Sequence, residues 1–209
     1  MTTTPVVVVE RASSPLGAAL VTQLRRRGAE VEPLTTWEDH GEVDVYVHVG
    51  PWSGPPAVRP LVESSDEDFA AAFERPVLEL MWSLHAAWAH LRRPGARVII
   101  VVPTIGMAGA PGLAAFAAAA EAQRLLVKSA ARQWGAEGVA MNVVAPDLAA
   151  LAPGAAGLPS VSLSAPALGD EAVGDLSSIA QLVCAIALDA TAALTGATLS
   201  ADGGTWMAP

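Results

Sequence analysis

The chain has 209 residues and a formal net charge of −9, from 12 basic and 21 acidic side chains. Hydrophobic residues make up 52% of it and charged residues only 16%, against about 25% charged in an average soluble domain. Such a composition excludes a disordered chain and leaves apolar surface to bury against another subunit. The acidic balance argues against nucleic-acid binding, which needs a basic surface. The single cysteine, Cys184, excludes an intramolecular disulfide framework and a cysteine-based zinc site.

Two long uncharged stretches, Val98–Ala120 and Leu148–Gly169, resemble membrane segments in composition alone. Prolines and glycines interrupt both, so we expect neither to span a membrane and expect no membrane partner. The first residues, Met1–Pro5, lack the basic region of a signal peptide. We therefore expect a cytoplasmic protein, and the length predicts one domain over residues 1–209.

In chain order, β-branched runs and helical periodicity predict a strand at Pro5–Glu10, a helix at Pro15–Arg27 and a brief edge strand at Glu30–Pro33. They next predict a strand at Asp44–Val49, a helix at Ser65–Leu91 and a strand at Arg97–Val102. The last elements are a helix at Pro111–Trp134, a strand at Val139–Val144, a helix at Leu176–Asp189 and a strand at Ala197–Ala201. This alternation is typical of an α/β fold with a doubly wound parallel sheet of the Rossmann-like kind.

Three features refine this prediction. Only ten residues separate Pro33 from Asp44, too few for a further helix and strand. We therefore expect about six strands and a sheet trimmed at one edge. Pro76 falls inside a predicted helix and is expected to kink or restart it. The segment Ala145–Glu171, rich in Pro, Gly, Ser and Ala, is expected to be a flexible flap over a binding site.

The order of these segments resembles that of the short-chain dehydrogenase/reductase family over nearly the whole chain. The segments that carry the resemblance are Val6–Leu20 (VVVVERASSPLGAAL), Asp44–Pro51 (DVYVHVGP), Arg97–Pro146 and Leu194–Gly204 (LTGATLSADGG). The resemblance implies the Rossmann-like fold. It also implies that subunits pair through two long helices, here Ser65–Leu91 and Pro111–Trp134.

The phosphate-binding turn of that family reads Thr-Gly-x-x-x-Gly-x-Gly, because glycines let the backbone approach a pyrophosphate. In this chain Arg11 replaces the first glycine of the motif. The pair Ser14-Pro15 aligns with the second glycine, which Pro15 replaces, and Gly17 corresponds to the third. Pro15 also removes an N–H group where a helix start would hold an anion. The alternatives are that Pro15 is simply a favourable first helical residue and that Arg11 binds phosphate through its side chain. We expect that no nicotinamide cofactor is bound.

The family's proton relay consists of a Tyr, a Lys four residues later, a Ser thirteen residues before the Tyr, and an Asn on the preceding long helix. The resemblance puts Phe116 at the Tyr position, Ala120 at the Lys position and Pro76 at the Asn position. Pro103 falls at the Ser position, with Thr104 one residue away. Phe cannot transfer a proton and Ala cannot carry a charge, so this acid–base machinery is expected to be absent.

Other residues are candidates for a different chemistry at the carboxyl edge of the sheet. His48, Thr104 and Asp147 lie at or just beyond the ends of predicted strands, where doubly wound folds bind ligands. Each has a structural alternative: a hydrogen-bonded histidine, a loop-capping hydroxyl and a helix or turn cap. Trp52 and Trp206 are candidates to line an apolar pocket. The spacing of the histidines predicts no metal site.

These observations leave three hypotheses. The first is a non-redox pseudoenzyme that forms a homo- or hetero-oligomer with a subunit of the same fold and stabilises it. Its contact surface would include residues 117–120, Ala122 and Leu126, which are small or apolar. The second is a non-redox enzyme on the same scaffold: a halohydrin-dehalogenase-like enzyme, an isomerase, a lyase or a cyclase that acts on an apolar small molecule. The third is an atypical NAD(P)-dependent oxidoreductase.

Overall fold

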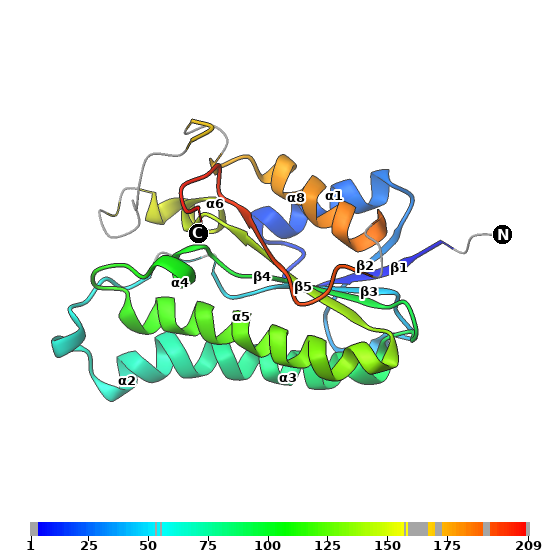
Figure 1. Ribbon diagram of the computed structural model, residues 1–209, viewed down its shortest axis with the longest axis horizontal. Helices are drawn as coiled ribbons and strands as arrows, with labels where there is room; N and C mark the ends of the chain where they lie inside the picture. Colours follow the sequence, from blue (N-terminus) through cyan, green and yellow to red (C-terminus); the bar gives the residue numbers. More distant parts are fainter. Residues whose placement is uncertain are drawn as a thin grey trace.

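The fold centres on a six-stranded parallel sheet in the order β2-β1-β3-β4-β5-β6 (Figure 1). The computed structural model describes residues 4–52, 54, 56–156, 158, 167–169, 173–189 and 193–207. The strands are β1 (Val6–Val9), β2 (Glu30–Pro33), β3 (Val45–Val49), β4 (Arg97–Val101), β5 (Ala140–Pro146) and β6 (Thr198–Ala201). The doubly wound sheet of six strands is confirmed, and β2 forms one edge of it, as the short 34–43 connection predicts.

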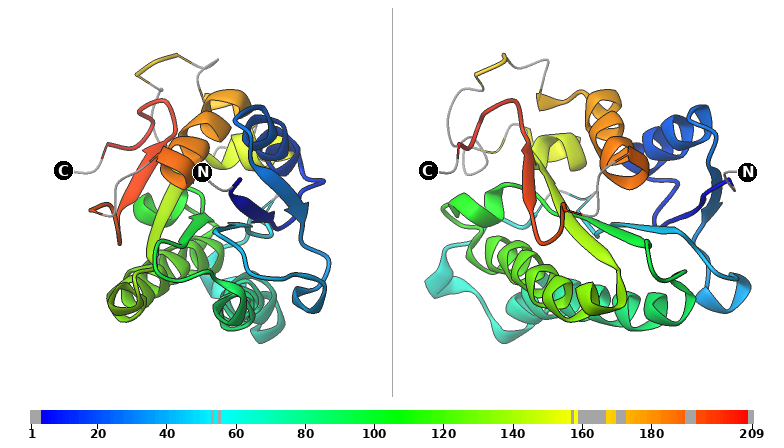
Figure 2. Two further views of the ribbon diagram at one scale, coloured as in Figure 1. Left: turned by 90° about the vertical axis from the view of Figure 1, so that its right-hand side faces the viewer. Right: turned by 45° about the vertical axis from the view of Figure 1, so that its right-hand side comes forward.

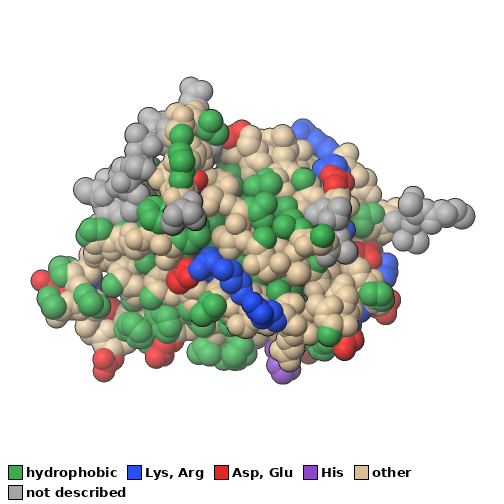
Figure 3. Space-filling view, in the orientation of Figure 1, with side chains coloured by type: hydrophobic (Ala, Val, Ile, Leu, Met, Phe, Trp, Pro, Cys, Tyr) green, Lys and Arg blue, Asp and Glu red, His purple; other side chains and the backbone are tan. Residues whose placement is uncertain are grey.

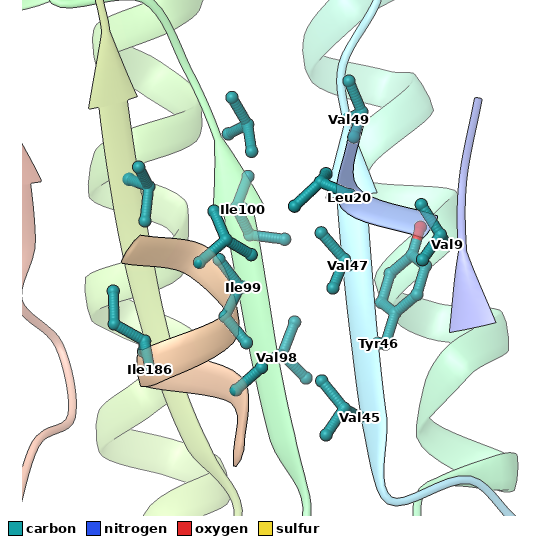
Figure 4. Packing of buried hydrophobic residues seen from close by; sticks show 14 of the residues in the cluster. Val9, Leu20, Val45, Tyr46, Val47, Val49, Val98, Ile99, Ile100 and Ile186 are labelled. Atoms are coloured by element: carbon teal, nitrogen blue, oxygen red, sulfur yellow. The ribbon is translucent and has the colours of Figure 1, made fainter. Parts of the chain in front are cut away.

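Helices cover both faces of this sheet (Figures 1 and 2). One face carries α1 (Pro15–Arg26), α6 (Leu148–Leu151) and α8 (Leu176–Cys184). The other carries α3 (Arg75–His90) and α5 (Ala114–Trp134). Because both faces are covered, the central strands are continuous apolar runs rather than alternating ones. Figure 4 shows this packing around β3 and β4, where Val45, Val47, Val98, Ile99 and Ile100 are buried.

The predicted helix at Ser65–Leu91 is interrupted before Pro76. Ser65 begins it with a reciprocal capping box to Asp68 at the start of α2 (Asp66–Phe69). A π-helical segment, η3 (Ala70–Glu74), follows, and α3 then starts with Pro76 in its first turn. Proline has no N–H to donate, and the wider π turn immediately before it accommodates that loss. The expected restart at Pro76 is confirmed.

Two expected segments begin differently in the structure. The helix expected from Pro111 begins at Ala114, and a short helix, α4 (Ile105–Ala108), precedes it. The start of the expected flap at 145–171 is instead folded into β5, α6 and η5 (Pro153–Ala155). Its apolar side chains form a small core with α4 and the start of α5; the buried members are Ile105, Leu113, Leu148, Ala152 and Ala155. Residues 157, 159–166 and 170–171 of the expected flap lie outside the described residues.

Within the described residues, no helix is both long and apolar enough to cross a membrane. The uncharged stretch at 98–120 is divided between β4, α4 and the start of α5. Its hydrophobicity therefore reflects burial inside the α/β fold.

Candidate functional site

The turn between β1 and α1 has a left-handed residue and a close backbone contact. Arg11 adopts a φ of 50°, and its carbonyl accepts a hydrogen bond from the Ser14 N–H at 2.8 Å. Ser14 caps α1 through a bond from the Gly17 N–H to its Oγ at 3.1 Å, and Pro15 is the first helical residue. A Cβ on Gly17 would lie 2.1 Å from the Arg11 carbonyl oxygen. Gly17 is therefore required so that α1 can pack against this turn.

Side chains of this turn are held by β3 and α3. Glu10 accepts hydrogen bonds from the Tyr46 hydroxyl and from His48 Nδ1, and Tyr46 Oη lies 3.2 Å from His48 Nδ1. We call these three residues the Glu10 cluster. Arg11 forms an ion pair with Glu79 of α3. The side chains of the first two residues of the turn, Glu10 and Arg11, are therefore bound on the side of the sheet that α3 covers.

The Glu10 cluster holds a carboxylate beside a neutral phenol. Burial alone would raise the pKa of Glu10, but the hydrogen bond and charge of His48, the Tyr46 hydroxyl and the charge of Arg11 together hold it below its ordinary value. Burial and the neighbouring Glu10 charge raise the pKa of Tyr46 well above 10. Within the described residues, His48 Nε2 is buried and has no hydrogen-bond partner. His48 is fully buried, so a substrate proton would have to reach it through the packed core.

Thr104 and Asp147 lie at the carboxyl ends of β4 and β5, as expected, and both are engaged in local structure. The Thr104 hydroxyl donates to the Pro146 carbonyl at 3.3 Å, and the Thr104 N–H donates to the same oxygen at 2.9 Å. Asp147 caps α6 by accepting the Ala149 N–H at 2.7 Å. Burial and the charge of Asp202 raise the pKa of Asp147. The geometry matches the structural alternatives given for both residues.

Trp52 occupies the carboxyl edge of the sheet between α1 and α5. Its side chain is buried, with 1% exposure, and its Nε1 donates to the Val101 carbonyl at the end of β4 at 3.0 Å. Its ring meets Phe116 of α5 edge to face, with centroids 5.1 Å apart. A Cβ on Gly50 would lie 2.3 Å from the Trp52 ring nitrogen, so the indole also packs closely on the backbone that precedes it.

Trp52 separates two hollows of very different size. Between the β1–α1 turn and Trp52 the free volume is about 10 Å³, bounded by Ser14, Pro15, Leu16, Val49, Gly50, Trp52 and Leu151. On the other side of the indole, a cavity of about 490 Å³ lies between the described residues of the segment after β3 (51, 52, 54 and 56–68), the η3 and α3 helices and the start of α5. We call it the α3–α5 cavity. Trp52 is the one lining residue that the two hollows share among the described residues.

The four positions that the resemblance assigns to the proton relay have packing roles. Ala120 is 1% exposed and faces α4, where a Cβ on Gly106 would lie 2.7 Å from the Ala120 Cβ. The Pro76 carbonyl accepts a hydrogen bond from Gln123 Nε2 at 2.7 Å. Pro103 is buried between β4 and α4, and Phe116 packs on Trp52.

Several of these contacts have little or no signal in the sequence. The Glu10–His48 and Arg11–Glu79 contacts join residues 38 and 68 positions apart. The one usable signal is that Tyr46 and His48 alternate in β3 and so share a face beside the end of β1. Trp206 does not line the α3–α5 cavity. The part of the chain that the structure describes holds no group of three or more metal-ligating side chains.

Comparisons with known proteins agree on one family. A family model described as enoyl-(acyl carrier protein) reductase matches residues 34–205. A Burkholderia thailandensis oxidoreductase of the short-chain dehydrogenase/reductase family is 22% identical, with a TM-score of 0.76 over 98% of this chain and 93% of that one. A double mutant of a Serratia marcescens short-chain dehydrogenase/reductase is 23% identical, with a TM-score of 0.78 over 96% and 97% of the two chains.

A third structure is a Brucella melitensis short-chain dehydrogenase/reductase described as a glucose/ribitol dehydrogenase. It is 17% identical, with a TM-score of 0.78 over 98% of this chain and 97% of the other. No sequence among curated proteins matches the chain. At these identities the structures show the fold, whereas the family model covers most of the chain and shows the family. The chain belongs to the short-chain dehydrogenase/reductase family.

Proposed function

We propose that this chain works without a nicotinamide cofactor, as a subunit that stabilises or completes an active subunit of the same fold. The observation that carries the proposal is the state of the β1–α1 turn. Glu10 and Arg11 are bound to β3 and α3, Pro15 offers no N–H, and about 10 Å³ is free between the turn and Trp52. A pyrophosphate needs free backbone N–H groups and room at this point.

The positions assigned to the proton relay support the same proposal. The side chains of Phe116, Ala120, Pro76 and Pro103 contain no group that exchanges a proton, and Ala120 is enclosed by α4. The family model supports the family and begins at residue 34, after β1, the turn and α1. The hypothesis of a non-redox enzyme draws no comparable support from His48, Thr104 and Asp147, because each is engaged in a structural contact.

The surface of α3 and α5 supports a role in assembly. Leu78, Met81 and Trp82 of α3 and Leu125 of α5 are exposed, Trp82 by 62% and Leu125 by 59%. Figure 3 shows hydrophobic side chains along the lower side of the molecule, where these helices lie. Exposed apolar side chains on neighbouring helices are typical of a subunit interface. We call these four residues the α3/α5 face.

Three of the contact residues predicted from the sequence are wrong. Ala117, Ala119 and Ala120 are buried inside the chain, against the core beneath α5. The period of α5 turns these alanines toward the sheet, so they cannot contact another subunit. Ala118 is exposed, and Ala122 and Leu126 are half-buried, so these three stay candidates beside the four residues of the α3/α5 face.

An activity assay tests the proposal. The purified chain, supplied with reduced nicotinamide cofactors and a panel of ketones and enoyl thioesters, is expected to give no turnover above the blank. Phe116→Tyr is expected to stay inactive, because the turn and the enclosed Ala120 are unchanged. The chain is expected to raise the activity or melting temperature of an intact homologous subunit from a neighbouring gene. Cofactor-dependent turnover by the wild-type chain alone would contradict the proposal.

A further inference from the structure

The α3–α5 cavity has the size and lining of a small-molecule site. Its volume of about 490 Å³ lies within the range of about 300–1,000 Å³ typical of ligand pockets. Most of its lining is apolar, and the apolar lining residues include Trp52, Pro56, Ala72, Pro76, Leu113 and Phe116. These side chains come from the segment after β3, from η3 and α3, and from the start of α5. An apolar molecule of one or two rings would bury most of its surface there.

The inner wall of the cavity is fixed before any ligand arrives. Trp52 is held by its hydrogen bond to the Val101 carbonyl and by its edge-to-face contact with Phe116. The start of α3 is held by the Gln123 bond to the Pro76 carbonyl. A wall that is already ordered reduces the entropy lost on binding.

The charges at the cavity leave one guanidinium without a partner. Asp68 pairs with Arg59 at 3.2 Å, and Glu79 pairs with Arg11. Hydrogen bonds from the backbone and side chain of Ser65 and the charge of Arg59 lower the pKa of Asp68, which keeps it ionised. Arg75 lines the same cavity, and within the described residues no acidic side chain lies within ion-pair distance of it.

The charged residues that line the cavity are two arginines, Arg59 and Arg75, and two acids, Asp68 and Glu79. Each acid pairs with an arginine other than Arg75, so the exposed Arg75 guanidinium is available to pair with a ligand. A guanidinium presents a planar fork that suits a carboxylate or another oxyanion. The geometry favours a ligand with an apolar body and one anionic group.

We propose that the α3–α5 cavity binds a small apolar acid whose anionic group pairs with Arg75. The apolar body would lie against Trp52, Phe116 and Leu113. This site goes beyond the proposed assembly role and does not depend on it. Trp52 stands between the cavity and the β1–α1 turn, so a ligand in the cavity does not occupy the space beside that turn.

Calorimetric titration of the full chain with 2-naphthoate and with the neutral 2-naphthamide tests this proposal. The two probes share the naphthalene ring and differ in charge. Naphthoate is expected to bind about fivefold or more tightly than naphthamide, because only naphthoate can pair with Arg75. Arg75→Gln is expected to remove this preference while retaining weak binding of both probes. Arg26→Gln, an exposed position on α1, is the matched control and should keep the preference.

A second variant locates the bound probe. Ala72→Phe adds a ring into the cavity and is expected to abolish binding of both probes while the circular dichroism spectrum stays unchanged. Equal affinities for the two probes in the wild type would overturn the role of Arg75. Binding that is unaffected by Ala72→Phe, or no binding at millimolar concentration, would overturn the site itself. Detection of dinucleotide binding in a separate titration would contradict the proposed function and leave this result standing.

Discussion

Glu10 is the residue on which the β1–α1 turn depends most. Its carboxylate accepts hydrogen bonds from Tyr46 and His48, two side chains that β3 places on one face. In a dinucleotide-binding turn, this segment must keep its backbone available to a phosphate. Here the side chains of the first two residues of the turn already have partners. Glu10 is hydrogen-bonded to two residues of β3, and Arg11 forms an ion pair with a residue of α3. A change at Glu10 therefore tests stability, not cofactor affinity.

Glu10→Gln is expected to lower the free energy of unfolding at pH 7 by about 1–3 kcal/mol, because the amide replaces a charged acceptor that satisfies two buried donors. The pKa of Glu10 is lowered in the folded chain from its ordinary value of 4.5. Its stabilisation is therefore present above that value and is lost as the pH falls through the lower, folded pKa. Urea unfolding followed from pH 7 to pH 3 measures both effects.

The control for this experiment is Glu137→Gln, which removes an exposed carboxylate in the short 3-10 turn Gly135–Glu137 that follows α5. It is expected to leave both the stability at pH 7 and the acid dependence unchanged. If Glu10→Gln showed the same acid dependence as the wild type, Glu10 would not be an ionised member of the cluster.

The sequence predicts single-residue roles where a local rule applies. Gly17 at the third glycine and Asp147 as a helix cap follow from turn chemistry within a few residues. The Glu10 cluster does not follow from the sequence, because its contacts depend on which β3 residue lies beside the end of β1. Glu79 likewise reaches Arg11 only through the placement of α3 on the sheet.

At the scale of elements, long apolar runs were predictable and short helices were not. The strands β1, β3, β4 and β5 are mostly β-branched or apolar, a composition typical of buried parallel strands. The short helices α4 and α6 are stabilised by a shared small core instead of by their own four-residue sequences. The sequence did not predict α4 and α6, because these helices depend on contacts between segments that are distant in the chain.

The exposed apolar side chains of α3 and α5 predict that the chain assembles through these two helices. The wild-type chain is expected to be oligomeric, and Trp82→Glu or Leu125→Glu is expected to shift it to monomer while its circular dichroism spectrum is retained. A carboxylate on the α3/α5 face would lose its hydration when the interface forms. The free-energy cost of this desolvation is several times larger than the free energy of association that one exposed apolar side chain contributes. Light scattering at several protein concentrations measures the oligomeric state of the wild type and of each variant.

Thr22→Glu, on the exposed side of α1, serves as the control and should leave assembly unchanged. Ala119→Glu is unsuitable for this purpose, because Ala119 is fully buried and a charge there would disrupt the fold. A wild-type chain that stays monomeric at high concentration, and that also ignores a homologous subunit, would remove the support for an assembly role.

At the scale of the whole molecule, Trp52 divides the carboxyl edge of the sheet. The hollow between Trp52 and the β1–α1 turn has a volume of about 10 Å³, and the α3–α5 cavity on the other side of the indole has about 490 Å³. Doubly wound folds bind their ligands at this edge, where the strand order reverses. In this chain the fold is kept, and the larger of the two hollows that Trp52 borders lies beside α3 and α5, away from the turn that holds a dinucleotide in such folds.

Direct titration tests the proposed loss of nicotinamide-dinucleotide binding. Isothermal calorimetry of the full chain with the oxidised and reduced forms of NAD and NADP is the measurement. We expect no saturable binding of any of the four at millimolar concentration, because Pro15 has no N–H, the Ser14 and Gly17 N–H groups are bonded within the turn, and Trp52 leaves a hollow of only about 10 Å³ beside it. A micromolar dissociation constant for any one of them would contradict this account.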